Sequence, residues 1–125
     1  MIIIAGTIDL ADPSRRTEAV AATAALQQAT REQEPGCGAY CFAADPVIEG
    51  RIQVYELWAD EASLAAHFLH PNYLNMRNLL GEIGLKGADN RKYRCDLSEP
   101  VYDATRTPRA DFFTETPSNE NRREP

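Results

Sequence analysis

The sequence predicts an α+β fold in which strands and helices follow one another in the order β-α-β-β-α-β. Three observations predict it. A β-branched run opens the chain, two stretches are rich in helix-forming residues, and aromatic or branched runs flank the turn-like segment 45–50. The 125 residues suit one domain, which we place at residues 1–97, followed by a C-terminal extended arm at residues 98–125.

The first half of the domain is expected to be a strand, a helix and the first strand of a hairpin. The strand covers residues 2–10, and Asp12 with Pro13 can start a helix over residues 13–34. That helix is predicted to bury a stripe of small apolar residues, and Pro35 with Gly36 ends it. The stripe consists of Ala19, Ala22, Leu26 and Ala29. The hairpin strands are expected at residues 38–44 and 51–58.

The second half adds a broken helix and a last strand. Asp60 is a plausible N-cap for a helix through Leu69, which Pro71 interrupts and which resumes over residues 72–83. The inward-facing residues are predicted to be Leu64, His67, Phe68, Tyr73, Met76, Leu80 and Ile83. Residues 91–97 alternate strictly, with Tyr93, Cys95 and Leu97 on one face, and predict the last strand.

This order is that of the ferredoxin-like fold, a four-stranded antiparallel sheet with both helices on one face. The strands here are apolar on both faces: in residues 51–58, Ile52 and Val54 oppose Tyr55 and Leu57. One layer of helices covers one face only, and a large exposed apolar surface implies a partner. We therefore expect a homodimer that packs sheet against sheet.

The composition excludes several classes of function. With 13 Lys and Arg against 19 Asp and Glu the net charge is −6, which argues against binding to nucleic acid or to an anionic membrane. No apolar run approaches the roughly 18 residues of a membrane span, and the opening segment is typical of a strand, not of a signal peptide. The three cysteines, Cys37, Cys41 and Cys95, are expected to be free thiols of a cytoplasmic protein, with no disulfide and no metal site.

One face of the third strand carries the candidate chemistry. Glu56 shares that face with Ile52, Val54 and Trp58, and a carboxyl group among apolar neighbours is either a bonded structural group or a pocket acid or base with a raised pKa. His67 is predicted to face inward from the second helix and to converge with Glu56 between the two layers. A histidine beside a carboxylate is a competent general base near neutral pH.

Three segments resemble the antibiotic biosynthesis monooxygenase (ABM) domain over residues 1–97: Glu34-Pro35-Gly36-Cys37, the run 55–61 (YELWADE), and Leu64-Ala65-Ala66-His67. The resemblance implies a dimeric α+β barrel, with a pocket in each subunit between sheet and helices. It also implies a small quinol-monooxygenase-like enzyme that oxidises a quinol-like or polycyclic aromatic substrate with O2 and uses no cofactor. The substrate itself then reduces oxygen once a base has deprotonated it.

The same resemblance implies roles for individual residues. His67 or Glu56 would be the base, while Trp58, Tyr40 and Phe42 would form walls and Asn72 and Tyr73 would be donors at the mouth. Tyr40 would donate a hydroxyl to the substrate or simply pack. Two alternatives stay open. One is an isomerase or other proton-transfer enzyme of the autoinducer-2-degrading type, and the other is a ligand-binding domain without activity.

The arm differs in composition from the domain. Its apolar residues, Val101, Tyr102, Phe112 and Phe113, are expected to anchor residues 98–115 on the body or on a partner subunit. The stretch Thr116–Pro125 has no large apolar side chain, so a disordered end is the alternative there.

Overall fold

The computed structural model describes residues 1–114 and confirms the ferredoxin-like α+β fold. The elements are β1 (Ile2–Leu10), a short 3₁₀ turn η1 (Pro13–Arg15), α1 (Arg16–Gln33), β2 (Cys37–Ala44), β3 (Arg51–Trp58), α2 (Glu61–Leu69), α3 (Pro71–Ile83) and β4 (Leu85–Arg94). The chain divides into two compact units, Met1–Cys95 and a second that begins at Asp96.

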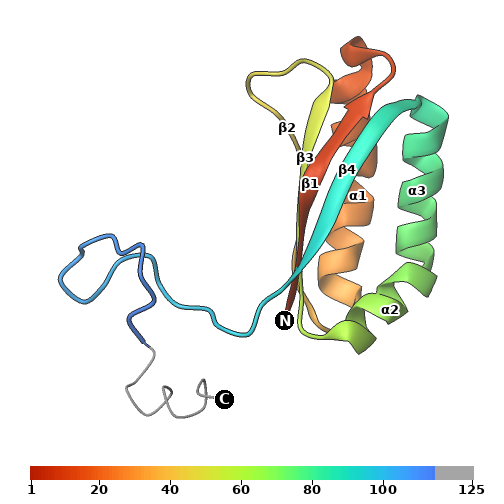
Figure 1. Cartoon of the computed structure of the whole chain (residues 1–125). Helices are drawn as coiled ribbons and strands as arrows, with labels where there is room; N and C mark the ends of the chain where they lie inside the picture. The colour runs from red at the N-terminus through yellow and green to blue at the C-terminus, as the bar shows by residue number, and fades with distance from the viewer. Residues whose placement is uncertain (115–125) are drawn as a thin grey trace. The chain divides into compact units, whose positions relative to one another are not determined.

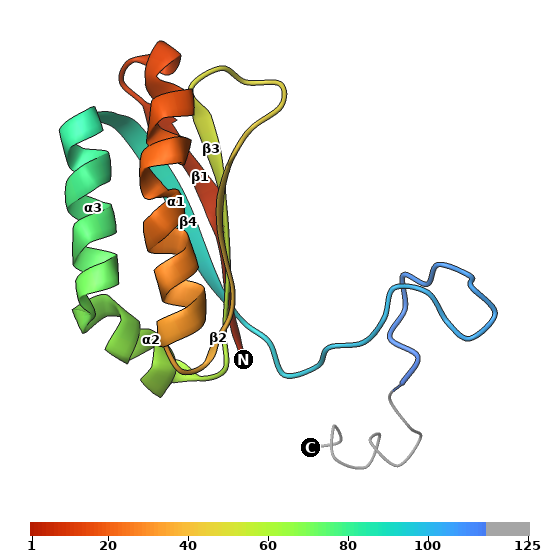
Figure 2. The same cartoon turned by 180° about the vertical axis from the view of Figure 1, so that it is seen from behind.

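The first unit has two layers. Its four strands form one antiparallel sheet in the order β2-β3-β1-β4, and all the helices cover the same face of that sheet (Figures 1 and 2). The core lies between the layers, where β1 and β3 contribute alternate residues and α2 and α3 contribute Leu64, Met76, Leu80 and Ile83. On the opposite face Tyr55 and Tyr93 are 44% and 50% exposed, so the sheet is apolar on both faces as predicted.

The predicted stripe of α1 is wrong at Ala22, whereas Ala19 is buried, Leu26 is half-buried against the core and Ala29 is half-buried. The helix buries Ala19, Thr23, Gln27 and Thr30, whereas Ala22 is exposed. The polar residues fit there because the Thr23 and Thr30 hydroxyls donate to the carbonyls of Ala19 and Leu26 (2.9 and 2.8 Å). Gln27 accepts from the Phe42 N–H at 2.9 Å and donates to the Phe42 carbonyl at 3.2 Å. These two bonds give partners to the Phe42 N–H and C=O groups on the edge of β2 that has no neighbouring strand.

The last strand was predicted too late and too short. Instead of residues 91–97, β4 covers Leu85–Arg94, and Cys95 and Leu97 lie beyond it. Gly84, with φ of +99°, ends α3 and lets the chain enter the strand at once. All ten residues of β4 are exposed, so their sequence has little of the apolar alternation by which strands are recognised.

The second unit has no helix or strand among the residues described, Asp96 to residue 114. An isolated bridge joins Tyr102 to Pro108, and the Asp103 carboxylate accepts bonds from the backbone N–H groups of Thr105 and Thr107. The anchoring of residues 98–115 stays a prediction, and the stretch Thr116–Pro125 lies outside the described residues. Throughout residues 1–114 no helix is long and apolar enough to cross a bilayer, and all three cysteines are free.

Candidate active site

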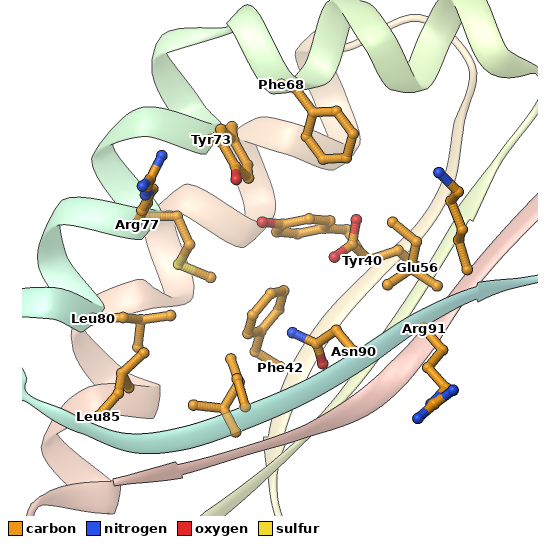
Figure 3. A pocket seen from close by; sticks show the side chains of 15 residues that line it. Tyr40, Phe42, Glu56, Phe68, Tyr73, Arg77, Leu80, Leu85, Asn90 and Arg91 are labelled. Atoms are coloured by element: carbon orange, nitrogen blue, oxygen red, sulfur yellow. The ribbon is translucent and has the colours of Figure 1, made fainter. Parts of the chain in front are cut away.

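A cavity of about 350 Å³ opens between the helix-covered face of the sheet and α2 and α3 (Figure 3). Its walls are mainly apolar and aromatic, and Glu56 contributes a carboxyl group. The lining residues include Ile4, Tyr40, Phe42, Phe68, Tyr73, Met76, Leu80, Asn90 and Lys92. Figure 3 shows Phe68 and Tyr73 reaching down from the helices and Tyr40 and Glu56 reaching in from the sheet.

The strand register builds the floor of this cavity. Tyr40 pairs with Glu56, Glu56 with Ile4, and Ile4 with Lys92, so these four residues form one row across the sheet. Paired residues project from the same face, which here is the helix-covered one. In the next row Gly6 pairs with Asn90, and a Cβ at Gly6 would meet the Asn90 Cα at 2.6 Å. Glycine is therefore needed for β4 to approach and place Asn90 in the floor.

Glu56 is the carboxyl group of the cavity. It is 6% exposed, and its Oε1 accepts a 3.0 Å hydrogen bond from the Trp58 indole N–H. Burial raises the pKa of Glu56 to about 7; the Trp58 bond acts in the opposite direction, and the charge of Glu34 adds to the rise. A carboxyl group that titrates near neutrality can take up and release a proton at physiological pH.

His67 lies behind Glu56 and does not line the cavity. It is only 1% exposed, and its Nδ1 is 2.7 Å from the Glu34 carboxylate, which places the ring proton on Nδ1. Nε2 is 4.0 Å from Glu56 Oε1. Burial lowers the pKa of His67, and the bond to Glu34 only partly opposes it, so the imidazole is neutral at neutral pH.

Glu34 is a site residue for which the sequence analysis proposed no role. It is buried at the C-cap of α1, and its second oxygen accepts a 3.2 Å bond from the Asn72 amide. A carboxylate at a helix C-terminus is disfavoured by the helix dipole. That unfavourable position in the sequence indicates that the Glu34 carboxylate binds groups outside its own helix. Gly36, with φ of +84°, then turns the chain back into β2.

Comparison with known proteins agrees with this architecture. The sequence matches the family described as antibiotic biosynthesis monooxygenase over residues 1–79. The chain belongs to the ABM family. The matched segment contains Glu34, Glu56 and His67.

Several solved structures share the fold of this ABM domain. A candidate antibiotic biosynthesis monooxygenase from Deinococcus radiodurans superposes with a TM-score of 0.68 at 20% identity, covering 82% of this chain and 100% of its own. A counterpart from Caulobacter crescentus gives 0.68 at 21% identity, over 78% and 90% of the two chains. An uncharacterized protein of Synechocystis sp. is 27% identical over 93 residues, which cover 74% of this chain and 62% of the relative's length.

The structure separates the predicted site residues of the ABM domain into two groups. Glu56, Tyr40, Phe42 and Tyr73 line the cavity, whereas His67, Trp58 and Asn72 stand behind it. The Trp58 ring packs on His67, with centroids 4.4 Å apart, and Asn72 holds Glu34. Burial raises the pKa of Tyr40, so its hydroxyl stays protonated and can donate a hydrogen bond. Phe68, for which the sequence predicts only an inward direction, also lines the cavity, as do Asn90 and Lys92, for which it predicts no role.

Proposed function

We propose that this ABM domain is a cofactor-independent monooxygenase that oxidises a quinol-like or polycyclic aromatic substrate with O2, with Glu56 as the base. One observation carries the proposal. A carboxyl group with a pKa of about 7 faces a cavity whose other walls are mostly apolar and aromatic. Such a cavity suits a planar aromatic ring and removes it from water, which strengthens electrostatic interactions with the base.

The reaction begins when Glu56 takes a proton from an acidic C–H or O–H group of the substrate. The resulting anion gives one electron to O2, and the substrate radical and superoxide combine in a new C–O bond. The peroxide anion takes the proton back from Glu56. Loss of the hydrogen that remains on the oxygenated carbon and cleavage of the O–O bond then release water and leave a carbonyl group. One oxygen atom enters the product and the other leaves as water.

The remaining polar groups support these steps. The hydroxyls of Tyr40 and Tyr73 point into the cavity in Figure 3 and are placed to donate to the oxyanion that forms on deprotonation. His67 acts as a positioning residue, because a neutral imidazole held by Glu34 leaves the pKa of Glu56 high. A cation 4.0 Å away would instead lower it.

The proposal includes a homodimer. The uncovered sheet face presents Ile3, Tyr55, Leu57 and Tyr93, and packing it against a second copy would bury these side chains. Sedimentation at micromolar concentration should then give twice the 13.9 kDa chain mass. A 13.9 kDa species alone would contradict the dimer but leave the chemistry of the cavity untouched.

The activity is tested by oxygen uptake with a panel of hydroquinones and anthrones and no added cofactor. We expect uptake by the wild type and at least a hundredfold loss in Glu56→Gln, since general-base catalysis contributes about 10²–10⁴-fold. Glu82→Gln, an exposed carboxylate on α3, is the matched control and should be unchanged. Turnover under anaerobic conditions would instead indicate a proton-transfer enzyme. Binding with no consumption of any compound would indicate a ligand-binding domain.

A further inference from the structure

A second cavity of about 440 Å³ adjoins the first one within the same unit. It lies between the first residues of β1, the end of β4 and the helix α2. Its lining consists of Ile2, Glu61, Leu64, Ala65, Phe68, Lys92 and Arg94. Phe68 and Lys92 also line the cavity that holds Glu56, so these two side chains stand at the boundary between the two spaces.

Two cations of β4 face these cavities. Lys92 pairs with Ile4 and Arg94 pairs with Ile2, and both isoleucines are buried on the helix-covered face. The two cationic side chains therefore project from that face, and no salt bridge within residues 1–114 involves either of them. Arg91, a third cation of β4, also lines the first cavity, but it is paired with Asp89 at 3.3 Å. In a chain of net charge −6, these cations and Arg77 of α3 gather around the two cavities.

The acidic groups nearby do not cancel this charge. Glu61 is the carboxylate of the second cavity, where it faces two cations. Glu56 is the carboxyl group of the first, and its burial favours the neutral form. The boundary therefore carries a positive charge that is available to an anion.

The register also fixes the spacing between base and cation. Glu56 and Lys92 pair with Ile4 from opposite sides. Their Cα atoms are thus two strand spacings apart, about 10 Å. An aromatic ring lying over Ile4 would have one edge at Glu56 and the other at the Lys92 ammonium. Phe68, which reaches down from α2 beside Glu56 and Tyr40 in Figure 3, offers an aromatic partner for that ring.

We infer that the ligand of this domain is an aromatic acid, whose ring occupies the Glu56 cavity and whose carboxylate is bound by Lys92 and Arg94 in the adjoining cavity. The inference names the substrate class of the proposed monooxygenase, and only the orientation of the reacting position rests on that function. The carboxylate binds through charge-assisted hydrogen bonds from the two cations, and these bonds fix which ring position meets Glu56.

Two probes that differ by the carboxylate test this inference: 6-hydroxy-2-naphthoate and 2-naphthol. Binding is measured by calorimetry and by quenching of Trp58, the only tryptophan of the chain. We expect the naphthoate to bind at least tenfold more tightly at low salt. Lys92→Met and Arg94→Met should each remove most of this preference, because they weaken the binding of the naphthoate at least fivefold more than that of 2-naphthol. Lys86→Met is the matched control, because Lys86 is on the same strand and lines neither cavity.

The outcomes separate this inference from the proposed function. Equal affinities for the two probes, or an equal loss for both in the lysine and arginine variants, would overturn the inference. Since binding needs no turnover, a preference that persists while no oxygen is consumed would refute the monooxygenase and leave the aromatic-acid ligand standing. Oxygen uptake with uncharged quinols but with no aromatic acid would support the monooxygenase and overturn the aromatic-acid ligand.

Discussion

Replacing Glu34 by alanine tests the buried network behind the cavity. The wild-type carboxylate accepts bonds from His67 Nδ1 at 2.7 Å and from Asn72 Nδ2 at 3.2 Å, and all three side chains are buried. Alanine leaves His67 Nδ1 without a partner and away from water, while Asn72 Nδ2 keeps only its 3.5 Å bond to Gln33 Oε1. A stranded donor costs about 1–3 kcal/mol, so we expect the free energy of unfolding to fall by about 3 kcal/mol. That is a large part of the roughly 5–15 kcal/mol of a typical domain.

Urea unfolding followed by the fluorescence of Trp58 measures this loss, because that side chain is fully buried and packs on His67. Glu32→Ala is the matched control. Glu32 lies on the same helix but is exposed, and its bond to Gln28 is on the surface, so its loss should stay within about 0.5 kcal/mol. If Glu34→Ala unfolded at the same urea concentration as Glu32→Ala, the network would not hold the layers together.

Five further outcomes follow from the site and the sheet. Burial raises the pKa of Glu56 from 4.5 to about 7, so between these pH values the native state binds more protons than the unfolded chain. The wild type should therefore lose about 3 kcal/mol of stability relative to Glu56→Gln as the pH rises from 4.5 to 7. Urea titrations at each pH measure this change. The rate of oxygen uptake should rise over the upper part of the same window and level off above it, and a rate independent of pH from 5 to 9 would exclude Glu56 as the base. His67→Gln keeps a neutral donor for Glu34, and uptake should fall less than tenfold; a loss as large as that of Glu56→Gln would restore His67 as the base. Tyr55→Glu places a charge on the uncovered sheet face and should give a 13.9 kDa species in sedimentation, whereas Glu49→Gln in the hairpin loop should not. Gly6→Ala drives a methyl group into the backbone of β4 and should cost at least about 2 kcal/mol of stability; an unchanged melting temperature would contradict the close approach of the two strands.

The parts of the fold that follow a periodic pattern were predictable from the sequence. β1 and β3 have the bounds that their β-branched and aromatic alternation gives, and Asp60 caps α2 as its position indicates. The predictions are wrong in the two elements where the buried residues and the apolar residues do not coincide. In α1, Thr23, Gln27 and Thr30 are buried because each finds a backbone or side-chain partner, which no apolar stripe reveals. In β4, exposure on the edge of the sheet leaves no pattern to recognise.

The sequence predicts which types of residue form the candidate site, but not which of them line the cavity and which are buried behind it. The period of two placed Glu56 on the core face of its strand, and helical spacing turned His67 inward. Neither pattern distinguishes a side chain that lines a cavity from one behind it, because that depends on how the two layers separate. Glu34 is 33 residues from His67 in sequence, and Lys92 reaches the cavity only through pairing of β4 with β1. Contacts of this kind depend on tertiary structure alone.

The burial of His67 explains why a carboxyl group rather than an imidazole faces the cavity. An imidazole bonded to Glu34 and exposed to substrate would tend to hold its proton, and the resulting cation would keep Glu56 ionised well below neutrality. Burial instead lowers the pKa of His67 and raises that of Glu56. In the proposed reaction, a proton taken from the substrate would therefore stay on Glu56 and be available to return to the peroxide. The two perturbations have one cause, the exclusion of water by Trp58, Tyr40 and the α2 helix, and any substitution that admits water there should weaken both together.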